Sequence, residues 1–133
     1  MKFIGKYGEH AVMLKLLSSG VEAYLAIKSN QEDYDITVIT DVMQVKRIQV
    51  KSTVLQNKNT NNSIDGTEKN YDYLVIVIRD SNTNTNRFFV LTKTEADTER
   101  GNSVKMGTSQ TSKNISYVKN SLIQYEDEWQ KIL

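Results

Sequence analysis

The sequence has no cysteine and only one histidine, His10, among its 133 residues. Without cysteine, the chain has no disulfide bond, no cysteine-ligated zinc and no thiol nucleophile. A single histidine excludes a two-histidine zinc site and leaves one candidate base for a serine–histidine–aspartate triad. We expect His10 to be a surface or packing residue of a helix, because that is the commoner role.

Phosphate-binding and membrane signatures are also lacking. No GxxxxGK segment is present, which excludes a P-loop. The longest apolar run, Leu74 to Ile78, is too short to cross a bilayer, and the N-terminus does not resemble a secretory signal. We therefore expect a cytoplasmic protein with no membrane partner.

The charges nearly cancel, with 17 Lys and Arg against 16 Asp and Glu, for a net charge of +1. Binding to nucleic acid would therefore depend on a local basic patch. The composition, 38% hydrophobic and 25% charged, is typical of a folded globular protein. A chain of this length fits one domain, which we assign to residues 1–133.

The hydrophobic pattern predicts helices at both ends of the chain. Residues 8–19 have an apolar face and are followed by Gly20, with Gly8 as the helix start and Glu9 in the first turn. Residues 116–133 carry apolar side chains at spacings of four and three. In this second helix we expect Tyr125 and Trp129 to serve core or dimer packing.

Between the helices, the pattern predicts five strands, at residues 21–28, 34–40, 46–54, 73–79 and 87–92. The fourth is almost continuously apolar and should be covered on both faces. The polar composition of residues 56–70 predicts a long loop or a partly disordered segment, and that of residues 80–86 predicts a hairpin connection. The order indicates an α+β fold with an N-terminal helix, a central mixed β-sheet of about five strands and a C-terminal helix.

Four polar residues could meet in this fold. Asp35 opens the second strand, Gln49 and Lys51 share one side of the third, and Glu9 lies near the start of the first helix. Two carboxylates and an amide oxygen suit a hard cation such as Mg²⁺. A nearby ammonium could orient a water or stabilise charge on a phosphate. These are the parts of a metal-dependent phosphodiesterase.

Asp35, thirteen intervening residues and then Gln49-Val50-Lys51 resemble the second and third motifs of the PD-(D/E)XK nuclease superfamily. The Gly8-Glu9 start of the first helix is similar to that of its Holliday-junction-resolvase-like and restriction-endonuclease-like members. The resemblance covers roughly residues 5–92. It implies a DNA endonuclease with Glu9, Asp35 and Gln49 as ligands of Mg²⁺, for which Mn²⁺ substitutes, and with Lys51 as the catalytic lysine.

Two positions depart from the family pattern. Tyr34 stands where a proline usually precedes the aspartate, and Gln49 replaces an acidic ligand. Some members of the superfamily carry glutamine there, and a degraded site is the alternative. The sequence leaves both open.

Basic residues around the third strand are candidates for binding branched or duplex DNA. Lys46, Arg47 and Lys58 lie close to Lys51 in the sequence, with no acidic residue among them. So few phosphate contacts give weak, salt-sensitive binding, which a symmetric homodimer would double. A homodimer is therefore a further hypothesis.

Simpler interpretations exist for each residue taken alone. Glu9 could be a helix-dipole partner, Asp35 a turn residue, and Lys51 a solvated charge. Only their combination favours a nuclease. The alternatives are a catalytically inactive nuclease-fold module that binds nucleic acid or a partner protein, and an unrelated α+β interaction protein.

Overall fold

The computed structural model describes residues 1–26, 33–55, 60–63, 69–81, 83–99, 105–108 and 120–133. Its main sheet has five strands in the order β1-β2-β3-β5-β6. They are β1 (Glu22–Leu25), β2 (Ile36–Ile39), β3 (Val45–Leu55), β5 (Tyr73–Asp80) and β6 (Thr85–Thr92). Strands β3 and β5 are parallel, and the other neighbouring pairs are antiparallel. The predicted α+β fold with a mixed sheet is therefore confirmed.

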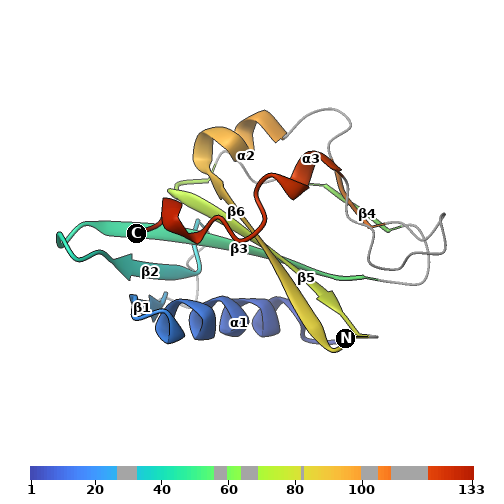
Figure 1. Cartoon of the computed structure of the whole chain (residues 1–133), viewed down its shortest axis with the longest axis horizontal. Coiled ribbons are helices and arrows are strands. Elements are labelled where there is room, and N and C mark those ends of the chain that lie inside the picture. The colour runs from blue at the N-terminus through green and yellow to red at the C-terminus, as the bar shows by residue number, and fades with distance from the viewer. Residues whose placement is uncertain (27–32, 56–59, 64–68, 82, 100–104, 109–119) are drawn as a thin grey trace.

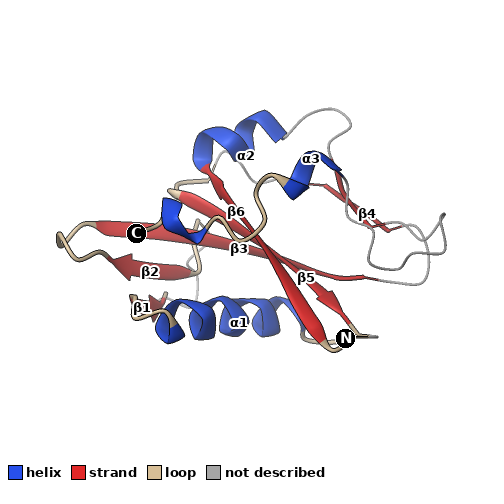
Figure 2. Cartoon of the chain, in the orientation of Figure 1, coloured by secondary structure: helices blue, strands red, loops and turns tan. Residues whose placement is uncertain are grey.

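Helices cover both faces of this sheet. Helix α1 (Ile4–Ser18) lies on one face, whereas α2 (Lys93–Glu99) and α3 (Asn120–Ile123) lie on the other (Figures 1 and 2). A short 3₁₀ helix, η1 (Trp129–Lys131), follows near the C-terminus. Strands β4 (Thr60–Ser63) and β7 (Lys105–Thr108) form a separate antiparallel ribbon. None of the helices described is long and apolar enough to span a membrane.

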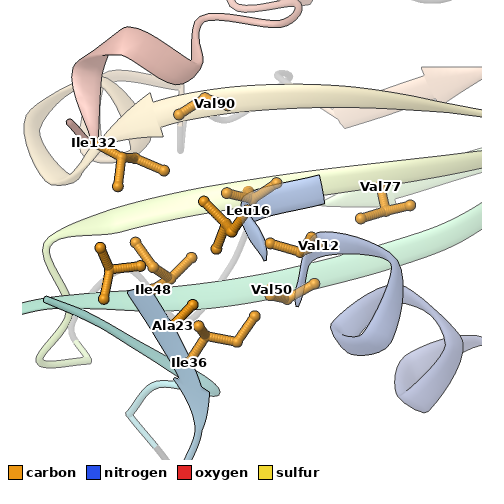
Figure 3. Packing of buried hydrophobic residues seen from close by; sticks show 11 residues of the cluster. Val12, Leu16, Ala23, Ile36, Ile48, Val50, Val77, Val90 and Ile132 are labelled. Atoms are coloured by element: carbon orange, nitrogen blue, oxygen red, sulfur yellow. The ribbon is translucent and has the colours of Figure 1, made fainter. Parts of the chain in front are cut away.

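Each face of the sheet has its own hydrophobic cluster. Under α1, side chains from the helix, from β1, β2, β3, β5 and β6 and from the C-terminus pack together (Figure 3): Val12, Leu16, Ala23, Ile36, Val38, Ile48, Val50, Val75, Val77, Val90 and Ile132. The opposite cluster joins β5 and β6 to α2 and α3 through Leu74, Ile76, Ile78, Phe89, Leu91, Ala96 and Leu122. Residues Leu74 to Ile78 of β5 alternate between the two clusters and are all buried. The prediction of a strand covered on both faces is confirmed.

The first helix begins earlier than the sequence pattern predicts. It starts at Ile4, so Gly8 lies in its second turn and Glu9 is outside the first turn. The prediction that Gly8 starts the helix is therefore wrong. The C-terminal end is as expected, because Gly20 follows the helix with a φ of 79°, which favours glycine.

The predicted helix over 116–133 is wrong within the residues described. The chain forms only α3 and η1 there, and residues 116–119 lie outside the described part. Asp127 has a φ of 55°, and Glu126 forms a β-bridge with Phe89, so the segment crosses the edge of β6. Leu122 and Ile132 consequently reach opposite faces of the sheet.

The aromatic residues of this segment pack against the hydrophobic clusters, as predicted, with Tyr125 buried and Trp129 partly buried. Tyr125 is buried, and the Trp129 ring lies 5.4 Å from the ring of Phe88. The Tyr125 hydroxyl donates a hydrogen bond of 2.9 Å to the buried Glu99 of α2. Burial and this hydrogen bond raise the pKa of Tyr125 to about 12.

The sequence analysis did not predict α2, although a local signal was present. Thr92 Oγ1 accepts the Glu95 backbone N–H at 3.1 Å, and Glu95 Oε1 accepts the Thr92 N–H at 2.9 Å. This is a capping box, which satisfies two backbone donors at a helix start.

The remaining strand predictions hold for the most part. Each has a counterpart in the sheet, and β5 and β6 form the expected hairpin with Asp80 opposite Thr85. Strand β1 is shorter than predicted, and residues 27 and 28 lie outside the described part. The predicted loop over 56–70 contains β4, and most of its other residues also lie outside the described part.

Candidate functional site

Asp35 lies where β2 begins, beside an edge of β3. Because β2 starts at Ile36, the part of β3 beyond Ile48 has no pairing with β2. Its backbone is therefore accessible to a side chain, and Asp35 Oδ2 accepts the Val50 N–H at 2.8 Å. The same oxygen accepts Gln49 Nε2 at 2.9 Å. Asp35 is thereby fixed against β3 by two hydrogen bonds to one oxygen.

Gln49 is buried although it is polar. It faces the α2 side of the sheet, beside Leu74 of β5, and only 6% of its surface is exposed. Its amide nitrogen is used by Asp35, whereas its Oε1 has no hydrogen-bond partner among the residues described. A buried acceptor without a partner is costly. The unpartnered oxygen is therefore available to a ligand at this position.

Glu9 of α1 acts on Asp35 through its charge. Its carboxylate pairs with Lys6 Nζ at 3.0 Å, and Lys6 itself is largely exposed. Burial raises the pKa of Asp35, and the negative charge of Glu9 raises it further. The Val50 hydrogen bond and the charges of Lys51 and Lys6 act in the opposite direction. Glu9, Asp35, Lys6 and Lys51 therefore form one electrostatically coupled group.

The structure thus joins Asp35 directly to Gln49 by a hydrogen bond, whereas Glu9 and Lys51 are linked to Asp35 through their charges. Lys51 follows Gln49 by two positions on the same side of β3, as predicted. The site contains two carboxylates, one buried amide oxygen and ammonium groups. Across the described part of the chain, no group of three His, Cys, Asp or Glu side chains could hold a metal. Any metal here would therefore need the amide oxygen as well as the two acids.

The basic residues proposed for DNA are less well placed. Arg47 is held by Asp72, which accepts its backbone N–H at 2.8 Å and its Nε at 3.3 Å. Burial raises the pKa of Asp72, but the bonds from Arg47 outweigh it and lower the pKa overall. Lys46 Nζ lies 5.9 Å from the centre of the Tyr73 ring. Lys58 lies outside the described residues.

Two surface depressions lie away from this group. A groove of about 420 Å³ separates α1 from β6 and is lined by Tyr7, His10, Leu14, Asn86 and Phe88, among others. His10 is exposed there, in agreement with the predicted surface role. The second, of about 290 Å³, lies beside β1 and the β2–β3 turn. Neither contains Glu9, Asp35, Gln49 or Lys51.

Two residues of the site were not found from the sequence. Lys6 lies one turn before Glu9, but the predicted start at Gly8 placed it outside the helix. Gly8 was interpreted as a helix start, whereas it contacts β3 in the structure. The buried position of Gly8 depends on the packing of α1, which no local pattern reveals.

Comparison with known proteins supports the fold. No protein-family model matches the chain, and no curated protein sequence matches it significantly. Among solved structures, the chain is similar to a bacterial homing endonuclease, I-Ssp6803I. The TM-score is 0.66 over 100% of this chain and 93% of that one, with 17% sequence identity. The chain therefore shares the fold of that solved structure.

Proposed function

We propose that this protein is a metal-dependent DNA endonuclease of the PD-(D/E)XK type, with glutamine at the third ligand position. The observation that carries the proposal is the buried Gln49 Oε1, which has no hydrogen-bond partner among the described residues, on an amide whose nitrogen donates to the Asp35 carboxylate. An amide oxygen left in this way beside a carboxylate fits a cation better than it fits a purely structural role.

The residues present fit Mg²⁺. Glu9, Asp35 and Gln49 would be its ligands, and all three offer the oxygen atoms that hard cations prefer. When bound, such a cation supplies Lewis-acid stabilisation of the charge that develops on a scissile phosphate. Two carboxylates and a neutral amide place less negative charge there than three acids would, so binding should be comparatively weak. Mn²⁺ should substitute.

The other charged groups would handle the phosphate and the water. Lys51 is on the same side of β3 as Gln49, so its ammonium would orient the attacking water and stabilise the phosphate. Lys6 pairs with Glu9 in the structure. A cation that takes Glu9 as a ligand would weaken that pair, leaving Lys6 to attract the DNA backbone.

DNA as the substrate is supported by the fold and by the charge distribution. The endonuclease I-Ssp6803I has the same fold. Residues 100–119 include four basic residues, Arg100, Lys105, Lys113 and Lys119, and no acidic one, although the whole chain has a net charge of only +1. Strand β7 lies within this basic segment and pairs with the polar strand β4. A two-stranded ribbon is of a size that fits the major groove.

A catalytically inactive module remains the second candidate, because one observation favours it. Gln49 Nε2 donates to Asp35 at 2.9 Å, which gives the carboxylate a neutral partner without any metal. Such a protein would keep the nuclease fold and bind DNA or a partner protein without cutting.

A cleavage assay distinguishes the two functions. Labelled linear duplex, single-stranded, four-way-junction and plasmid DNA would be incubated with Mg²⁺, Mn²⁺ or EDTA, alongside the Asp35→Asn variant. The endonuclease should cut with either metal, and cutting should be absent in EDTA and in the variant. DNA binding without cutting would support the inactive module, and cutting by the variant would overturn the assigned site.

A further inference from the structure

Helix α1 approaches β3 most closely at Gly8. A Cβ atom placed on this glycine would lie 1.7 Å from Ser52 Oγ and 2.8 Å from Ser52 Cβ. Both distances are shorter than any real contact between such atoms, whereas Val50 Cγ1, at 3.7 Å, would be an ordinary neighbour. Any side chain at position 8 would therefore push the helix away from the strand.

The second glycine of the helix provides an internal comparison. A Cβ on Gly5 would meet nothing within 4 Å, and Gly5 is exposed. Glycine within a helix lowers stability relative to alanine, because more backbone freedom is lost on folding. At Gly8 the loss of stability is accompanied by a close approach of the helix to β3. At Gly5 there is no such approach.

The close approach lies next to the candidate site. Glu9 directly follows Gly8, and Lys51 directly precedes Ser52. The separation of α1 from β3 at this point therefore sets how closely the Glu9 carboxylate approaches the strand against which Asp35 is held. Ligands of Mg²⁺ must lie about 2.0–2.1 Å from the ion in near-ideal geometry, so a small outward shift of the helix would remove Glu9 from the set.

We propose that Gly8 is a positioning residue for the metal site, and that its contact with Ser52 holds Glu9 within reach of the cation bound by Asp35 and Gln49. The inference rests on the proposed function, because it requires that Glu9 is a ligand. Gly8 itself contacts neither metal nor substrate.

The test is a set of matched substitutions with Mn²⁺ affinity as the main measurement. Gly8→Ala should weaken Mn²⁺ binding about tenfold or more, as loss of a group that orients a ligand does. Gly5→Ala should leave the affinity unchanged. Ser52→Gly removes both atoms that an alanine at position 8 would meet, so Gly8→Ala/Ser52→Gly should recover the affinity of Ser52→Gly alone.

A partial relief variant covers the case in which Gly8→Ala does not fold. Ser52→Ala removes Oγ and leaves the Cβ contact at 2.8 Å. Gly8→Ala/Ser52→Ala should therefore bind Mn²⁺ more weakly than Gly8→Ala/Ser52→Gly. Equal affinities in these two double variants would overturn the proposal.

A second comparison separates positioning from general destabilisation. In a Glu9→Gln background the ligand is already impaired, so adding Gly8→Ala should reduce Mn²⁺ affinity much less than it does in the native chain. An equal reduction in both backgrounds would show that Gly8 does not act through Glu9. Native protein that does not bind Mn²⁺ at all would overturn the proposed function and this inference together, whereas native binding that Gly8→Ala leaves intact would overturn only the inference.

Discussion

Gln49 donates its amide nitrogen to Asp35 Oδ2 at 2.9 Å, and its own Oε1 is buried without a hydrogen-bond partner among the described residues. The hydrogen bond fixes the orientation of the amide, with its nitrogen toward the carboxylate and its oxygen directed elsewhere. A glutamate at this position would place two carboxylates in contact. In the proposed metal site, Gln49 would supply a ligand oxygen without that repulsion in the metal-free protein.

Asp35→Asn should abolish cleavage and leave the fold intact. Both hydrogen bonds to Asp35 end on one oxygen, which the carbonyl oxygen of the introduced asparagine can replace. Removal of a partly buried charge beside Glu9 should raise the free energy of unfolding of the metal-free protein. Loss of a ligand should weaken Mn²⁺ binding at least as much as loss of an outer-shell partner does, about 10- to 100-fold. Thermal unfolding with and without Mn²⁺ measures both effects, and a variant stabilised by Mn²⁺ as strongly as the native chain would contradict the prediction.

As the pH is lowered, metal affinity should begin to fall at a higher pH than it would if Asp35 had the ordinary pKa of an aspartate. The metal requires the ionised carboxylate, and the pKa of Asp35 is raised, mainly by burial and then by Glu9. As the pH falls through this raised value, protons compete with Mn²⁺. The free energy of unfolding of the metal-free protein should depend on pH in the opposite direction. The folded state binds this proton more tightly than the unfolded state, so ionised Asp35 destabilises the fold at pH values above its pKa. Titrating Mn²⁺ at several pH values tests the first effect, and Asp35→Asn should remove the Asp35 contribution.

Gln49→Glu should increase metal affinity by about tenfold, because the number of charged ligands strongly tunes cation binding. In a nuclease this variant should still cut DNA, at a lower Mg²⁺ concentration. In an inactive module it should give neither cutting nor saturable binding at millimolar Mg²⁺. Gln49→Met, which keeps the length of the side chain and removes both polar atoms, serves as the control and should bind more weakly than the native chain.

DNA binding should depend on the basic segment of residues 100–119. Lys105→Gln/Lys113→Gln removes two charges from it, and Lys2→Gln/Lys15→Gln removes two from the helical region, so both variants have the same net charge. Each lysine that contacts a phosphate contributes about 1 to the salt-dependence slope. In the first variant the magnitude of the salt-dependence slope should therefore fall by up to about 2. In the second variant it should fall by less. Fluorescence anisotropy in EDTA across a range of salt concentrations measures both, and equal slopes would refute a role of this segment.

Residues on regular strands could be assigned from sequence because alternation fixes their side. Gln49 and Lys51 are two positions apart in β3, so they face the same way wherever that strand lies. Asp35 was found because it precedes a β-branched run that became β2. Glu9 was predicted in the first turn of the helix, but it lies in the second turn because the helix begins at Ile4.

The C-terminal region shows where periodicity fails. Leu122, Tyr125 and Ile132 follow helical spacing, but the chain turns at Asp127 and passes the edge of β6. Leu122 and Tyr125 then pack on one face of the sheet, and Ile132 packs on the other. The spacing of apolar residues indicates which residues are buried, but not in which core they lie. Here residues buried in two separate cores happen to have the spacing of a single helix.

The parallel pairing of β3 with β5 joins two halves of the molecule, one that ends with β3 and one that begins with β5. We call the β3–β5 pairing the seam. Every residue pair across this seam, from Ile48 opposite Tyr73 to Leu55 opposite Asp80, is separated by 25 positions in the chain. Contacts between distant residues form late, because the entropy of loop closure must be overcome first. Glu9, Asp35, Gln49 and Lys51 all belong to the first half, but Leu74 beside Gln49 comes from the second. Burial of Gln49 Oε1 thus requires that the two halves have joined. In the proposed metal site, the affinity for metal would therefore report how completely the protein has folded.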